Sequence, residues 1–144
     1  MKKLLSILVL SLLFGGSGYA EIITFSKCYN VKEGNLKFRE DRYEKRNFVI
    51  SIKKRIISNS VVLTDEYYDK LSKKYSGQRK YFFTEDKIDS FNDLFVKTRD
   101  TIKANESNII TFEGIYDLKT KKIQKTISYS DINRKPEVLF IQCQ

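Results

Sequence analysis

The side chains that could carry acid–base chemistry in this chain are carboxylates, because the sequence contains no histidine. Histidine is the usual general base of serine and cysteine hydrolases and a common ligand of zinc and iron. Glu113, next to a glycine, and the adjacent Glu85 and Asp86 could act as acid and base on sugars. The spacing of these three carboxylates along the sequence does not indicate a catalytic acid–base pair. We therefore expect a non-catalytic protein and keep a carboxylate-only hydrolase as an alternative.

Metal and nucleotide chemistry have little support. Four oxygen-bearing side chains gather in one short segment, Asp86, Asp89, Asn92 and Asp93. A calcium-binding EF-hand loop needs ligands at alternate positions and a central glycine, and this segment has neither. The glycines beyond the first twenty residues lie far apart, so they form no phosphate-binding loop. We expect no metal site and no cofactor.

Aromatic residues are the candidates for ligand binding, since the chain has nine tyrosines and ten phenylalanines. They could line a cavity for an apolar molecule, and the alternative for each is that it fills the core. Four of the tyrosines have a hydroxyl that could orient a ligand: Tyr29, Tyr43, Tyr116 and Tyr129. We take these four as the candidate ligand-facing aromatics.

The first twenty residues have the three parts of a cleavable signal peptide. A positive start, Met1–Lys3, precedes the apolar run Leu4–Phe14, and a glycine-rich stretch ends in small residues at Gly18 and Ala20. The apolar run is shorter than the ~20 residues of a membrane-spanning helix. We predict cleavage before Glu21 and no transmembrane segment in the mature chain. The protein would then be exported, to the periplasm if the host has two membranes and otherwise to the medium.

Two cysteines, Cys28 and Cys143, lie near opposite ends of the predicted mature chain. Exported proteins meet an oxidising compartment, in which paired cysteines form disulfides. We predict a Cys28–Cys143 disulfide, with two free thiols as the alternative. Chain entropy gives such a bond about 4–5 kcal/mol of stabilisation. A bonded pair would leave neither sulfur available as a nucleophile or metal ligand.

The chain is basic, with 27 Lys+Arg against 18 Asp+Glu and a formal net charge of +9. Acidic residues alternate with most basic ones, as in residues 41–46, and lysine, isoleucine and asparagine share AT-rich codons. We therefore interpret the charge as a solvated surface and expect no nucleic-acid partner. An envelope-associated structural protein that rests its basic surface on an anionic layer is the alternative.

Most segments alternate apolar and polar residues with the period of a strand. The predicted strands are 22–28, a short one at Leu36 and Phe38, 48–52, 56–63, 79–84, one from about Leu94, 108–118, 122–129 and 138–143. Charged turns at 53–55 and 119–121 join two hairpins. We predict a further turn near residues 85–87. One helix is expected near 65–76, capped by Thr64 and ended near Gly77.

Strands that arrive as hairpins favour antiparallel pairing. We predict one domain over residues 21–144, mainly β with α+β as the alternative. Its antiparallel sheet of hairpins would curl into a sandwich or a small barrel. The function that fits best is a small exported binding or interaction domain. Its partner would be a small apolar ligand or an envelope protein.

Overall fold

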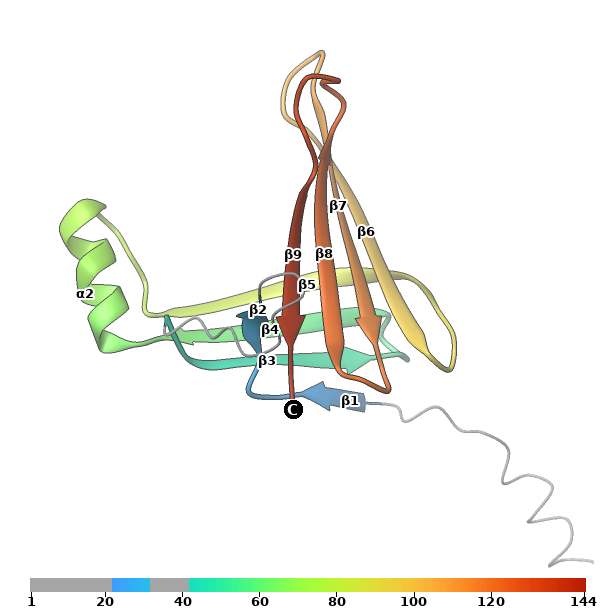
Figure 1. The fold of residues 1–144 in the computed structure, drawn as a ribbon, viewed down its shortest axis with the longest axis horizontal. Helices are drawn as coiled ribbons and strands as arrows, with labels where there is room; N and C mark the ends of the chain where they lie inside the picture. Colours follow the sequence, from blue (N-terminus) through green and yellow to red (C-terminus); the bar gives the residue numbers. More distant parts are fainter. Residues whose placement is uncertain (1–21, 32–41) are drawn as a thin grey trace, which may run out of the picture.

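A computed structural model of the chain describes residues 22–31 and 42–144. Their nine strands pair antiparallel in one curled half-barrel sheet, in the order β1-β3-β4-β5-β6-β7-β8-β9-β2 (Figure 1). The elements are β1 Ile22–Phe25, β2 Tyr29–Val31, β3 Tyr43–Ser51, β4 Ile56–Leu63, α2 Asp65–Lys74, β5 Tyr81–Phe91, β6 Phe95–Lys103, β7 Ile109–Asp117, β8 Lys122–Tyr129 and β9 Glu137–Gln142. The predicted mainly β class with one helix is confirmed. The predicted signal peptide, its cleavage site at Gly18, Ala20 and Glu21, and the short strand at Leu36 and Phe38 lie outside the described residues.

The sheet forms two layers that cross steeply (Figure 1). In the lower layer, β1, β3, β4 and β5 run side by side, and in the upright layer β6, β7, β8 and β9 rise from it. The β5 strand belongs to both, because residues 81–87 pair with β4 and residues 88–91 pair with β6. A register shift between Ile88 and Ser90 marks the crossing point.

Both predicted hairpins are present. The β3–β4 turn at residues 52–55 is closed by the Arg55 N–H donating to the Ile52 carbonyl at 3.1 Å, with Arg55 at a positive φ of 54°. In the β7–β8 turn, the Asp117 carboxylate accepts the N–H groups of Lys119 and Thr120 at 3.0 and 2.9 Å. These two bonds, chiefly that from Thr120, hold the pKa of Asp117 below its usual range.

The predicted helix is confirmed as α2, with Thr64 as its N-cap. The Thr64 hydroxyl oxygen accepts the Tyr67 N–H at 3.3 Å, and acidic residues at the start and lysines at the end complement the helix dipole. None of its ten residues is buried. The helix therefore joins β4 to β5 at the edge of the molecule and contributes little to the core (Figure 1).

The predicted turn near residues 85–87 is wrong. Residues 85–87 continue β5, which is an eleven-residue strand, and the turn comes after Phe91. There Asn92 Oδ1 accepts the N–H groups of Leu94 and Phe95, each at 2.8 Å. The run Glu85-Asp86-Lys87 is polar because this part of β5 lies largely in solvent.

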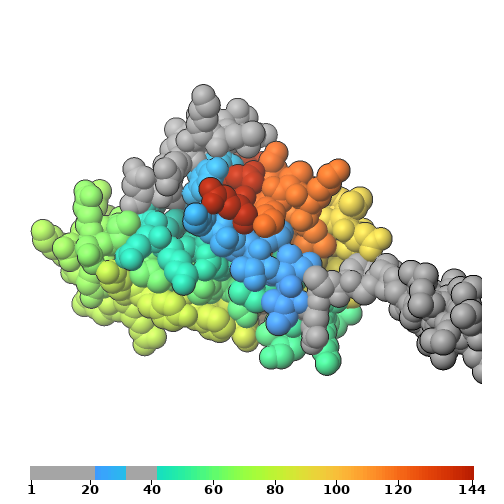
Figure 2. All heavy atoms as spheres, turned by 90° about the horizontal axis from the view of Figure 1, so that it is seen from below, coloured from blue at the N-terminus to red at the C-terminus, as the bar shows by residue number. Residues whose placement is uncertain are grey.

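The core occupies the corner where the two layers meet. Its buried side chains come from both layers: Phe25, Phe48, Ile50, Ile57, Ile88, Val96, Tyr116, Ile123 and Ile141. The predicted Cys28–Cys143 disulfide is confirmed and joins the β1–β2 connection to the end of β9. Ser26 and Gln144 exchange two backbone hydrogen bonds beside it, so the first and last described segments lie side by side (Figure 2).

No helix in the described residues is both long enough and apolar enough to cross a membrane.

Candidate functional site

The upright strands continue beyond the core, and the side chains on their inner face then line an open angle between the two layers. The buried row Val96, Tyr116, Ile123 and Ile141 fixes which face is the inner one. Because side chains alternate along a strand, every second residue beyond this row also points inward. The next two rows, in register, are Thr98, Gly114, Lys125 and Leu139, followed by Asp100, Phe112, Ile127 and Glu137.

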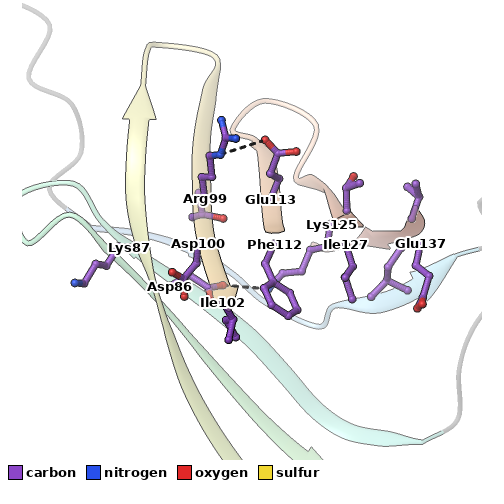
Figure 3. Close-up of a pocket in the computed structure, with 14 residues that line it drawn as sticks. Asp86, Lys87, Arg99, Asp100, Ile102, Phe112, Glu113, Lys125, Ile127 and Glu137 are labelled. Atoms are coloured by element: carbon purple, nitrogen blue, oxygen red, sulfur yellow. Dashed lines mark hydrogen bonds and ion pairs between the residues drawn. The ribbon is translucent and has the colours of Figure 1, made fainter. Parts of the chain in front are cut away.

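These two rows and the nearby part of β5 enclose a half-open groove of about 580 Å³ (Figure 3). We call it the corner groove. Its lining residues are Asp86, Lys87, Thr98, Arg99, Asp100, Ile102, Phe112, Glu113, Lys125, Thr126, Ile127, Glu137, Val138 and Leu139. In the close-up, the side chains of Ile102, Phe112 and Ile127 point to the same side. The wall of the corner groove is therefore apolar, although half of the lining residues are charged.

The apolar wall is not covered by the described part of the chain. Phe112 and Leu139 each expose 36% of their surface, and Ile102 exposes 50%. Burial of such a side chain gains about 1.5–3 kcal/mol. A group of such side chains left open in a concave site is typical of a surface that meets a ligand or partner.

The floor of the corner groove, next to the core, is an ion pair. Lys125 Nζ lies 3.1 Å from Asp86 Oδ2, and the Tyr116 hydroxyl lies 3.5 Å from the same oxygen and donates to it. The ammonium also stands over the Phe48 ring, 5.4 Å from its centroid. Burial, with the nearby Asp86 carboxylate, raises the pKa of Tyr116 well above its usual value. The Tyr116 hydroxyl is therefore a neutral donor that helps to fix the Asp86 carboxylate.

Gly114 lets the strands approach closely at this floor. A Cβ at this position would stand 2.5 Å from Thr98 Oγ1 and 2.9 Å from Tyr116 Cε2. Any side chain here would displace the Tyr116 ring or the Thr98 hydroxyl. The glycine thus leaves room for the Tyr116 ring and the Thr98 hydroxyl at the floor of the groove.

Glu137 lies at one rim of the corner groove, where two neighbouring side chains fix its carboxylate. Its Oε1 accepts the Tyr129 hydroxyl at 2.7 Å and lies 3.5 Å from Arg134 Nη2. The Arg134 guanidinium stacks over the Tyr129 ring, 3.6 Å from its centroid. These three residues position a carboxylate at the open end of the site.

The four candidate tyrosines are separated by the fold, and none is among the residues that line the corner groove. Tyr116 is fully buried beneath the floor, and Tyr129 supports the rim through Glu137. Tyr29 pairs with Gln142 on the far side of β9, and Tyr43 lies beneath the Arg46 guanidinium at 5.0 Å. Ligand contact through these tyrosines stays a prediction, and the structure gives Tyr116 and Tyr129 supporting positions.

The candidate carboxylates do not converge. Asp86 is held by Lys125, while Glu113 points to the other side of β7 from Phe112 and lies 4.0 Å from Arg99 (Figure 3). Glu85 does not line the groove. Within residues 22–31 and 42–144, no three acidic, histidine or cysteine side chains gather as a metal site would require. In the segment singled out for oxygen ligands, Asn92 instead caps the β5–β6 turn.

Four residues that form the corner groove were not predicted as site residues from the sequence: Phe112, Lys125, Ile127 and Leu139. They belong to strands that were predicted, but their alternation is identical to that of core residues on the same strands. A lysine within the apolar period of β8, between Ile123 and Ile127, is the one local signal of a partly polar inner face.

A scan against protein-family models, a search of curated proteins and a search of solved structures each returned no match.

Proposed function

We propose that this protein is an exported, non-catalytic binding domain whose corner groove receives a ligand with an apolar surface. The observation that carries this proposal is the exposed apolar wall of Ile102, Phe112 and Leu139 in a concave site. The volume of about 580 Å³ lies within the ~300–1,000 Å³ of typical ligand sites. The Cys28–Cys143 bond is consistent with export, since disulfides persist in oxidising compartments.

The charged residues around the wall favour an amphipathic ligand over a purely apolar one. Lys125 and Asp86 at the floor, and Glu137 at the rim, offer both signs of charge within the same groove. Polar groups of this kind orient a ligand that the apolar wall attracts. The paired state of Asp86 and the outward side chain of Glu113 give no support to acid–base catalysis.

The groove offers a matched pair of variants for a binding test. Phe112 and Ile115 lie on the same strand, each exposes 36% of its surface, and they point to opposite faces of the sheet. We expect Phe112→Ser to weaken uptake of the fluorescent hydrophobic probe N-phenylnaphthylamine about tenfold or more, because it removes an apolar contact worth ~1.5–3 kcal/mol. Ile115→Ser should leave uptake unchanged. The readout is a fluorescence titration on the oxidised protein.

Failure of the wild type to take up the probe, or equal loss in both variants, would contradict the groove as a binding site. Binding to anionic vesicles that disappears with added salt, without probe uptake, would instead favour the envelope-associated role.

A further inference from the structure

Among the described residues, two strand edges are open where β5 and β6 part. The β5–β6 ladder begins at Ile88 and Thr98, and on one side of that point the two strands diverge into different layers (Figure 1). Residues 81–87 pair with β4 on one side, and residues 99–103 pair with β7 on one side. In the described part of the chain, no strand pairs with the opposite side of either segment.

Hydrogen bonds at both ends of this segment show which β5 backbone groups face the opening. The Ile88 N–H donates to the Arg55 carbonyl at 2.9 Å, and the Lys80 carbonyl accepts the Leu63 N–H at 2.9 Å. In an antiparallel ladder such bonds recur at every second residue, so the even-numbered residues face β4. The N–H and C=O groups of Tyr81, Phe83 and Glu85 therefore point into the opening, where a strand would satisfy them.

The first four residues of the exposed β5 edge lack the features that usually prevent strand addition. Tyr81-Phe82-Phe83-Thr84 contains no proline, lysine or bulge, and Tyr81 and Phe83 expose 55% and 54% of their surface. The open part of the β6 edge, residues 99–103, has charged residues at 99, 100 and 103 and therefore no uncharged run of this length. Of the two edges, that of β5 is the better template.

The open edge leads into the corner groove. Asp86 and Lys87, at its end, line the groove opposite Ile102 and Phe112 of the upright layer. A strand placed beside β5 would thus pair its backbone with Tyr81, Phe83 and Glu85. Its side chains on the inner face would approach the apolar wall.

We propose that the ligand of this protein is an extended segment of another polypeptide, which adds to the β5 edge as a strand and places apolar side chains in the corner groove. This inference rests on the proposed function, because it names the class of ligand for the same groove. The opening between the β5 and β6 edges narrows toward Ile88 and Thr98, where the two layers meet. Such a wedge suits a single strand better than the edge of a second folded copy, which would bring a whole sheet with it.

Backbone methylation tests strand addition directly. A display library of random peptides of about ten residues, the length of a long strand, is selected on the oxidised protein. A selected peptide is then synthesised with N-methyl groups on its odd or on its even residues. We expect one pattern to weaken binding about tenfold or more and the other to be tolerated, since alternate N–H groups face β5. Equal tolerance of both patterns, or no selected peptide, would overturn the proposal.

Variants of the protein locate the edge. Glu85→Pro removes an N–H that faces the opening and leaves the ladder with β4 intact, while Glu85→Gln keeps the backbone as a control. Lys103→Pro is the matched change on the β6 edge, because the Ala104 N–H donates to the Asn108 carbonyl of the β7 side and the Lys103 N–H therefore faces away from β7. We expect Glu85→Pro to weaken peptide binding about tenfold, with the other two variants within about twofold of wild type. Circular dichroism checks that each variant is folded.

The remaining outcomes separate this inference from the proposed function. Peptide binding could be lost in Phe112→Ser and yet be unchanged by Glu85→Pro and by backbone methylation. That result would overturn strand addition but would still support binding in the corner groove. If Phe112→Ser leaves uptake of the fluorescent probe unchanged, the corner groove is not the binding site. A dimer in analytical ultracentrifugation that Glu85→Pro dissociates would overturn the choice of a foreign segment, because the edge would then be occupied by a second copy.

Discussion

At the scale of single residues, the floor of the corner groove depends on close packing around Tyr116. Gly114 leaves space for its ring, Asp86 accepts its hydroxyl, and Lys125 lies against the rings of Tyr116 and Phe48. The floor is thus a polar triad on an aromatic base. The three residues come from three strands: Asp86 from β5, Tyr116 from β7 and Lys125 from β8. Tyr116 and Lys125 are 30 and 39 residues from Asp86 along the chain.

Gly114→Ala should destabilise the protein by about 1–3 kcal/mol, because the new methyl group would overlap Thr98 and Tyr116. Urea unfolding followed by circular dichroism measures the change. Gly77→Ala is an informative comparison, since no heavy atom lies within 4 Å of its Cβ position and its cost comes from a positive φ of 73°. An unchanged midpoint for Gly114→Ala would show that the strands do not need this close approach.

Tyr116 also predicts a pH dependence. The folded state raises the pKa of this phenol, so the unfolded state loses the proton first as the pH rises. The stability that Tyr116 contributes is therefore complete below pH ~10 and declines as the pH rises above this value. We expect Tyr116→Phe to cost about 0.5–1.5 kcal/mol at neutral pH, with a difference from wild type that narrows above pH ~10. A difference that stays constant with pH would contradict this account.

At the scale of elements, β5 decides the architecture. It is the longest strand, it pairs with β4 in the lower layer and then with β6 in the upright layer, and it leaves an open edge in between. Residues 85–87 lie just before the point where β5 passes from β4 to β6, and Glu85 and Lys87 are exposed there. Their polarity explains why Glu85-Asp86-Lys87 resembles a turn in the sequence.

Proline substitutions at neighbouring positions of β5 should have unequal effects. Thr84 faces β4 with its backbone N–H, whereas that of Glu85 faces the opening. Thr84→Pro removes a ladder hydrogen bond, so we expect it to cost about 1–3 kcal/mol more than Glu85→Pro. Chemical denaturation of the two variants tests the assignment. If Glu85→Pro is the more destabilising of the two variants, the N–H of Glu85, and not that of Thr84, faces β4.

At the scale of the whole molecule, the half-barrel is closed at the corner and open above it. The edge strands β1 and β2 follow each other in the chain, and the Cys28–Cys143 bond and the Ser26–Gln144 pairing tie their connection to the end of β9. The disulfide joins positions 115 residues apart and thereby holds the first and last strands at the core.

Replacing both cysteines, as Cys28→Ser with Cys143→Ser, should cost about 2–5 kcal/mol of stability, because the unfolded chain is no longer constrained. Denaturant midpoints of the oxidised protein and the double variant give the difference. Mass spectrometry of the protein from an exporting host checks that the starting material carries the disulfide and begins at the predicted residue. The predicted mature chain begins at Glu21, and the bond lowers its mass by two hydrogen atoms. Equal midpoints would show that the bond contributes nothing to the fold.

Features with local signals were predictable from the sequence alone. The hairpins around 53–55 and 119–121, the Thr64 cap of α2 and the antiparallel class follow from alternation, turn residues and capping chemistry within a few positions. The cysteine pair was predictable as well, because two cysteines in a chain that is predicted to be exported have a single possible pairing.

The tertiary structure alone decided which inward-facing residues form the core and which form the groove. Phe112 and Tyr116 share one strand and one face, yet Tyr116 is fully buried and Phe112 is open. Their alternation is the same, so no periodicity could separate them. What separates them is their distance from the corner. That distance is set by the register of β6, β7 and β8 and by the point at which β5 leaves β6, and both depend on contacts between residues far apart in the chain.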